Sequence, residues 1–136
     1  LVATSSTDKT IKIWDTLTGK EKLTITGHAD GIANLVYSRD GKWITSSDDQ
    51  HEIKVWDAET GKLKMTFNKL KNSNFSPGLC SDAKTVASRG TNPNQIRIWD
   101  LETGNEKFTF KGHTGLILAV QFSPDGKLCV SSSEDA

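Results

Sequence analysis

Three near-copies of one pentapeptide constrain this chain more than any other feature. Ile-Lys-Ile-Trp-Asp occupies residues 11–15, Ile-Lys-Val-Trp-Asp residues 53–57 and Ile-Arg-Ile-Trp-Asp residues 96–100. Alternation of β-branched and basic residues predicts a strand with two unlike faces. Trp14, Trp56 and Trp99 are 42 and 43 residues apart, and a fixed period of this size indicates a repeat architecture.

Turn signals around each copy divide the repeat into strands. A Thr-Gly turn follows each Trp strand at residues 18–20, 60–62 and 103–105, and it predicts partner strands over 22–26, 63–67 and 106–110. Gly-His at 27–28 and 112–113 precedes apolar strands over 32–37 and 117–122, which end at Asp-Gly turns. No segment shows a sustained helical period, so the prediction is all-β throughout.

With these motifs the chain resembles the WD40 repeat family, whose repeats are the four-stranded blades of a β-propeller. The resemblance implies a partial β-propeller of about three four-stranded antiparallel blades with a half-blade at each end. We place the end of the first blade at 1–26, the second at 27–67, a degenerate third at 68–110 and the start of a fourth at 111–136. In the third, Leu70 replaces the expected His, and we expect the first strand, around 73–79, to be interrupted near Pro77.

The resemblance also implies a buried polar network in each blade that is structural rather than catalytic. In the second blade, counting places the carboxylate at Gln50, so we assign Asp49 as its substitute. The predicted network residues are His28, Ser46, Asp49 and Trp56 in the second blade, Ser88, Asn92 and Trp99 in the third, Thr4, Asp8 and Trp14 at the start, and His113, Ser131 and Asp135 at the finish.

In WD40 proteins, partners bind most often on the face where the loops that enter the blades converge. Carried over by position, the predicted partner-binding residues are Gly31, Ala33, Asp49, Ser73, Phe75, Thr91, Leu116, Leu118 and Glu134, with Thr7 as the corresponding residue at the start. Phe75, Leu116 and Leu118 suggest an apolar patch if exposed. The alternative for these three is core packing. Lys62, Lys64, Lys69 and Lys71 suggest either an acidic partner or a solvated edge.

Composition and spacing argue against several other functions. Seventeen basic and seventeen acidic residues give no net charge, so neither nucleic acid nor an anionic membrane is an expected partner. Three histidines and two distant cysteines lack metal-ligand spacing, so we expect no metal. The Thr-Gly-Lys turns lack the second, upstream glycine of a phosphate-binding loop, so we expect no cofactor. No Ser or Cys nucleophile lies in a Gly-flanked turn of the kind that hydrolases use, so we expect no enzymatic activity.

The sequence therefore predicts a non-catalytic scaffold that binds protein or peptide partners. The alternative is the regulatory or sensor arm of a larger signalling enzyme, such as a kinase or NTPase. Cys80 and Cys129 lie at different repeat phases, which fits free thiols and an intracellular location, cytoplasmic or nuclear. Residues 128–136 repeat the phase of residues 1–9, so we expect a segment of a longer protein, with self-association as the alternative way to close the propeller.

Overall fold

The computed structural model describes residues 1–70 and 77–135, whose strands form four antiparallel sheets. The first sheet holds β1 (Val2–Ser5), β2 (Thr10–Trp14) and β3 (Glu21–Thr26), and the second β4 (Ile32–Tyr37), β5 (Trp43–Asp48), β6 (Ile53–Asp57) and β7 (Leu63–Phe67). The third holds β8 (Gly78–Leu79), β9 (Thr85–Arg89), β10 (Gln95–Asp100) and β11 (Glu106–Lys111), and the last β12 (Ile117–Phe122) and β13 (Cys129–Ser133). The all-β prediction is confirmed.

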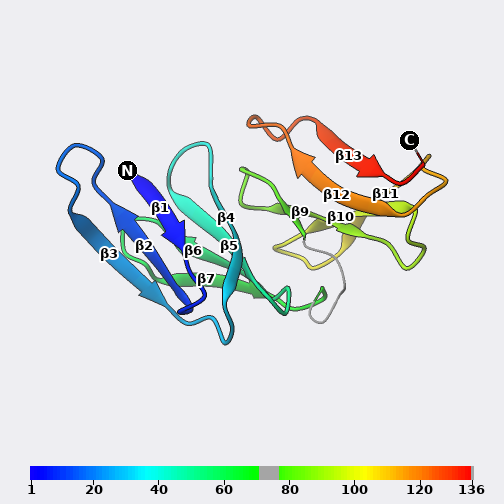
Figure 1. Cartoon of the computed structure of the whole chain (residues 1–136). Helices are drawn as coiled ribbons and strands as arrows, with labels where there is room; N and C mark the ends of the chain where they lie inside the picture. The colour runs from blue at the N-terminus through cyan, green and yellow to red at the C-terminus, as the bar shows by residue number, and fades with distance from the viewer. Residues whose placement is uncertain (71–76, 136) are drawn as a thin grey trace.

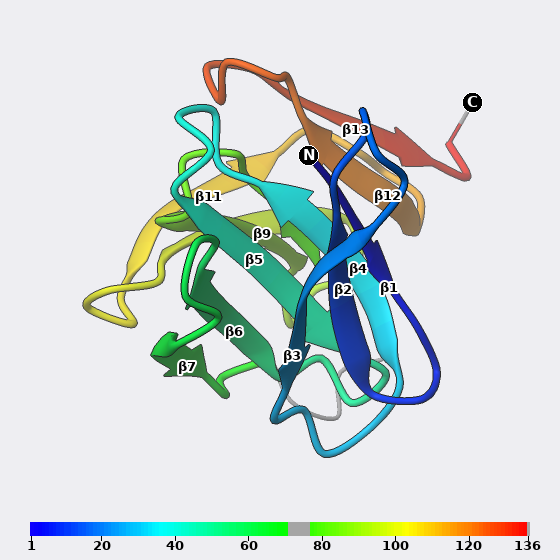
Figure 2. The ribbon, with the colours of Figure 1, turned by 90° about the vertical axis from the view of Figure 1, so that its left-hand side faces the viewer.

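The sheets follow one another as blades. Figure 1 shows β1 to β7 on one side and β9 to β13 on the other, and Figure 2 turns the N-terminal sheets toward the viewer. The first strands of the later sheets lie together, because β8 contacts both β4 and β12, while β3, β7 and β11 lie at the far edges of their sheets. This is the arrangement of consecutive blades in part of a propeller.

Each Trp strand is paired on both sides within its sheet. β6 pairs with β5 and β7, with Ile44 opposite Trp56, and a bulge falls between Val55 and Trp56. The Asp after the Trp closes the next turn: Asp57 Oδ1 accepts a hydrogen bond from the Thr60 backbone N–H at 2.8 Å. Equivalent bonds join Asp15 to Thr18 and Asp100 to Thr103. The repeated Trp-Asp pair thus joins core packing to turn formation.

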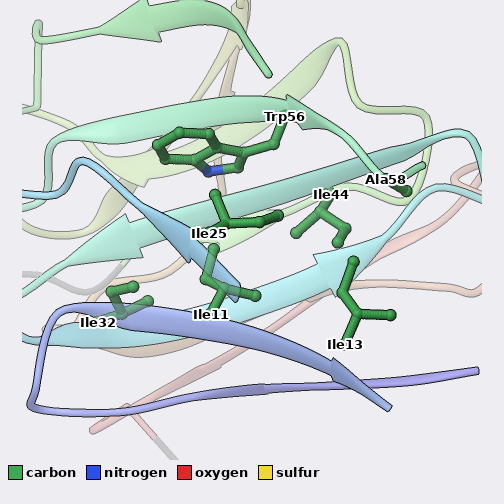
Figure 3. Close-up of a cluster of buried hydrophobic side chains, with 7 residues drawn as sticks. All are labelled: Ile11, Ile13, Ile25, Ile32, Ile44, Trp56 and Ala58. Atoms are coloured by element: carbon green, nitrogen blue, oxygen red, sulfur yellow. The ribbon is translucent and has the colours of Figure 1, made fainter. Parts of the chain in front are cut away.

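The hydrophobic core is shared between successive sheets rather than enclosed within one. Figure 3 shows the first cluster, in which Ile11, Ile13 and Ile25 of the first sheet face residues of the second, with Trp56 among them. A second cluster joins Val55 and Phe67 to the third sheet, and a third joins the third sheet to β12. Burial of each sheet therefore depends on its neighbour, as in other repeat architectures.

The third sheet is the least regular. Only Gly78–Leu79 of its first strand is described as β8, while β4 and β12 have six residues each. Its β8–β9 turn places Ala83 at φ 54°, where the matching turns use Gly41 and Gly126 at φ 71° and 70°. Ser73 and Phe75 lie outside the described residues.

Backbone hydrogen bonds also link the loops of one sheet to the next. Ile32 donates from its N–H to the Ser6 carbonyl at 3.1 Å, and Ile117 donates to the Pro93 carbonyl at 3.1 Å. At the opposite rim, Arg39 donates to the Ser81 carbonyl at 2.9 Å. Among the described residues, no helix is long and apolar enough to cross a membrane.

Candidate functional site

The second blade contains a buried chain of polar side chains that connects its entering loop to its central strands. His28 Nε2 lies 2.7 Å from Ser46 Oγ, and Trp56 Nε1–H donates to the same oxygen at 2.8 Å. All three residues are buried. Because an unpaired polar group costs about 1–3 kcal/mol in the core, Ser46 stabilises both neighbours at once.

The carboxylate beside His28 is Asp48, so the assignment of Asp49 is wrong in this respect. Asp48 Oδ2 lies 3.4 Å from His28 Nδ1, and Asp48 Oδ1 accepts the backbone N–H groups of Gln50 and Glu52. Asp48 is 1% exposed, whereas Asp49 is exposed. Counting missed Asp48 because the carboxylate stands two residues after Ser46, at the end of β5, whereas Asp135 stands four residues after Ser131, beyond the end of β13. Burial lowers the pKa of His28, against the opposing effect of Asp48.

The fourth blade carries a similar network in a more open setting. His113 Nε2 lies 2.9 Å from Ser131 Oγ, and His113 Nδ1 lies 2.8 Å from Asp135 Oδ2. The backbone N–H of Thr114 also donates to Asp135 Oδ2 at 2.8 Å. This N–H, together with His113, lowers the pKa of Asp135 to about 2. The carboxylate therefore holds the entering loop against the end of β13.

The first and third blades keep only parts of this arrangement. Trp14 Nε1–H donates to Thr4 Oγ1 at 2.9 Å, and Trp99 Nε1–H donates to Ser88 Oγ at 2.8 Å. Asp8 bonds locally, accepting the backbone N–H and the hydroxyl of Thr10.

Apolar packing replaces the histidine of the third blade. Leu70 is buried in the cluster between the second and third sheets. Asn92, predicted for the carboxylate position, is exposed, and its backbone carbonyl accepts the N–H of Gln95.

One buried group has the residue types of a metal site, which the sequence spacing did not predict. Ligand atoms of His28, Asp48 and Glu52 lie within 4.8 Å of one another. Glu52 is already paired with Lys54, whose Nζ lies 2.6 Å from its carboxylate. The Lys54 ammonium therefore supplies the positive charge that a cation would bring, and the group is best explained as an ion pair beside the histidine network.

Several predicted partner-binding residues meet in pairs at the rim of the entering loops. Asp49 donates from its backbone N–H to the Gly31 carbonyl at 2.8 Å, and Glu134 donates in the same way to the Leu116 carbonyl at 3.0 Å. A Cβ on Gly31 would lie 2.7 Å from Asp49 Oδ2 and 3.3 Å from the Thr7 Cα, so this position is tightly packed. The side chains of Asp49 and Glu134 are exposed, and so is Thr91 on its own loop.

Ala33 and Leu118 share an unusual backbone position. Both lie at irregularities in strand pairing, between Ile32 and Asn34 in β4 and between Ile117 and Ala119 in β12. A bulge leaves one residue unpaired and redirects its side chain. Ala33 is exposed and Leu118 is 55% exposed, whereas Leu116 is half-buried.

Leu118 lines a groove where the first strands of three blades meet. The cavity has a volume of about 360 Å³. Its walls come from β4, β8 and β12 and include Leu35, Val36, Leu79, Leu118, Val120 and Phe122, with Asn34 and Gln121 as polar members. Leu118 therefore stands at a surface where apolar contacts and polar groups are available together.

Comparison with known proteins identifies the class to which this arrangement belongs. Residues 1–15, 19–57 and 104–136 match the WD40 family, described as WD domain, G-beta repeat. These ranges cover well over half of the chain, and the chain belongs to the WD40 repeat family. The unmatched residues 58–103 include most of the third sheet, where the polar network is least complete.

Individual relatives match over about one repeat. The chain is 51% identical over 41 residues to nuclear distribution protein PAC1-2 from Postia placenta, which is 30% of this chain and 10% of that protein. It is 46% identical over 46 residues to Coronin-7 from Mus musculus, 34% of this chain and 5% of that protein. The chain therefore matches a tenth or less of the length of these relatives. WD40 repeats generally serve as protein-interaction scaffolds and are generally non-catalytic.

Proposed function

We propose that this chain is a non-catalytic binding module that holds a protein or peptide segment in the groove between β4, β8 and β12. The observation that carries the proposal is the bulge that turns Leu118 outward, at 55% exposure, into an apolar groove. Exposed apolar side chains beside a concave surface are typical of binding sites. Blades packed through shared cores keep this surface rigid, so little ordering entropy opposes binding.

The chemistry of the rim suggests what kind of segment fits. Asp49 and Glu134 are exposed carboxylates that follow β5 and β13, and each is bonded through its backbone N–H to the loop that enters its blade. A segment with an apolar anchor for the groove and a Lys or Arg beside it satisfies both features. Gly31, Ala33, Thr91 and Leu116 complete the proposed contact surface, together with Ser73 and Phe75 from outside the described residues.

We propose an intracellular setting for this activity. Both cysteines are free, and burial raises the pKa of Cys80 to about 11, so its thiol stays protonated. Free thiols are typical of reducing compartments. The absence of net charge supports a protein partner over nucleic acid or an anionic membrane.

Selection of peptides against the chain tests the proposal. Peptides chosen from a random library on the wild-type chain are expected to lose at least about tenfold in affinity for Leu118→Asp, because a charge replaces a central apolar contact. Leu63→Asp is the matched control, since Leu63 is 51% exposed on the outer strand β7.

Far-UV circular dichroism separates binding from folding in this test. Both variants are expected to keep the wild-type spectrum because both side chains are exposed. Equal affinity for Leu118→Asp and the wild type, or failure to select any binding peptide, would refute the groove as the binding site. Unfolding of Leu118→Asp would show that Leu118 serves the core.

A further inference from the structure

The groove between β4, β8 and β12 adjoins a second cavity at the opposite rim of the blades. This cavity has a volume of about 530 Å³ and lies where the three strands end and their turns begin. Val36, Leu79 and Phe122 line both the groove and the second cavity. The two hollows therefore form one surface that follows the first strands of three blades from rim to rim.

Equivalent residues of the three blades form the second cavity. Tyr37, Leu79 and Phe122 are the last residues of β4, β8 and β12, and they give its wall a mostly apolar surface. The lining residues two positions further along each turn are Arg39, Ser81 and Pro124. Arg39 is the charged residue among those that line the cavity, so an apolar wall is followed by a single cation.

Hydrogen bonds between neighbouring turns hold the backbone of Arg39 in place. Its N–H donates to the Ser81 carbonyl at 2.9 Å, and the Ser81 hydroxyl donates to the Pro124 carbonyl at 2.8 Å. The turns of three blades are therefore joined in series around the cavity. Because the backbone is fixed before any partner arrives, less ordering entropy opposes binding at Arg39.

The guanidinium of Arg39 is exposed and forms no ion pair with any residue that the structure describes. Asp40, beside it, accepts hydrogen bonds within its own turn. Hydrogen bonds from Ser123 and from the Lys127 N–H lower the pKa of Asp125, to which the charge of Arg39 adds a smaller effect. The hydrogen-bonding groups of Arg39 are therefore available to a carboxylate from a partner.

The two ends of the surface carry opposite charges. Asp49 and Glu134 present exposed carboxylates at the rim of the entering loops, and Arg39 lies at the other end. Leu118 and Pro124 are six residues apart along β12 and its turn, which corresponds to about 20 Å at about 3.3 Å per residue. A complementary segment therefore has a cation near its apolar anchor and an anion about six residues away from that anchor.

We propose that the groove holds an extended segment of a partner protein in which an Asp or Glu, about six residues from the apolar anchor, binds Arg39. This inference rests on the proposed function, because it adds a second fixed point to the occupant of the same groove. Asp49 and Glu134 repel the repeated phosphates of a nucleic acid, so a peptide with one acidic side chain fits both ends better.

Reversal of the charge at Arg39 tests the inference. The probes are the peptides selected on the wild-type chain, synthesised with acetylated and amidated ends so that only side chains are charged. Fluorescence anisotropy is expected to show at least about tenfold weaker binding to Arg39→Glu, because attraction becomes repulsion. Lys42→Glu is the matched control: it makes the same charge change in the same turn, outside the cavity lining, and should alter affinity less than about twofold.

Exchanging the charges between the two molecules tests for direct contact. A peptide whose acidic residue is replaced by Lys is expected to bind the wild type at least about tenfold more weakly and to recover on Arg39→Glu to within about threefold of the original pair. Arg39→Gln, which introduces no repulsion, should cost about threefold. Far-UV circular dichroism of these variants is expected to match the wild type because both side chains are exposed.

The outcomes separate this inference from the proposed function. Peptides that lose affinity for Leu118→Asp but bind Arg39→Glu like the wild type would overturn the inference and leave the proposed function standing. Equal losses for Arg39→Glu and Lys42→Glu would overturn it too, since net charge would then explain both. Undiminished binding to Leu118→Asp would overturn the proposed function and the inference together. If Arg39→Glu does not fold, unchanged affinity of Arg39→Gln would overturn the inference.

Discussion

The second and third blades solve the same packing problem with different chemistry. In the second, Ser46 joins the indole of Trp56 to His28, and Asp48 and the Glu52–Lys54 pair lie beside them. In the third, Ser88 Oγ accepts the indole N–H of Trp99, and Leu70 fills the position of the histidine with apolar contacts.

What both blades retain is the core shared with the preceding blade. Trp56 packs in the cluster with Ile25, and Trp99 lies 6.1 Å from Phe67, centroid to centroid. The difference teaches that the polar network is one of two ways to anchor the entering loop, whereas contact with the neighbouring blade is needed in both.

Truncating the two tryptophans should separate these contributions most clearly. Trp56→Ala is expected to lower the free energy of unfolding by about 3–5 kcal/mol, the usual cost of a large buried side chain. Trp99→Ala should cost less because Trp99 is only half-buried. Urea unfolding followed by circular dichroism measures both. Equal losses would contradict the greater dependence of the second blade on its indole.

Removing the serine hydroxyls should give the next largest difference. Ser46→Ala leaves two buried groups without their partner, so a loss of about 2–3 kcal/mol is expected, while Ser88→Ala leaves one and should cost about 1 kcal/mol. The same unfolding measurement applies. A smaller loss for Ser46→Ala than for Ser88→Ala would mean that the histidine contributes nothing to the network.

The histidine should make the stability of the second blade depend on pH. Burial lowers the pKa of His28, so the unfolded chain, whose histidine titrates near about 6.5, binds protons more readily than the folded chain. Stability is therefore complete above that pH and falls as the pH drops below it.

His28→Leu copies the third blade and should flatten this dependence. Urea midpoints at pH 7.5 and pH 5.5 provide the measurement. A variant whose midpoint falls with pH as steeply as that of the wild type would assign the dependence to another group.

The hairpin turns should give the smallest effect. Gly41 has φ 71°, and a Cβ placed on it would have nothing within 4 Å, so Gly41→Ala adds backbone strain of about 1 kcal/mol without a clash. Ala83 already accepts φ 54° in the third blade, where its methyl group is buried. Ala83→Gly should therefore change stability by less than Gly41→Ala, because relief of strain and loss of packing oppose each other. Thermal unfolding of both variants measures the two changes in stability. A larger change for Ala83→Gly than for Gly41→Ala would contradict this prediction.

Most of the fold was predictable because its signals are local. Alternation, the Thr-Gly turns and the 42–43 residue spacing predicted strands that lie within a residue or so of β2, β6 and β10. The carboxylate of the second blade was assigned wrongly, because counting assumes that it stands at the same distance after the serine in every blade, and Asp48 is two residues after Ser46 while Asp135 is four after Ser131. Asp48 lies at the end of β5 and faces His28 from there, which only the folded blade reveals.

The sequence by itself determined the repeat, its strands and its turns, since each depends on residues that are neighbours in the chain. Tertiary structure alone decided that Leu118 faces outward at a bulge and that Glu52 pairs with Lys54 beside His28. The reason is physical: Glu52 and Lys54 meet His28, more than twenty residues away in the chain, only in the folded blade, and what the neighbouring blade covers is set about forty residues away.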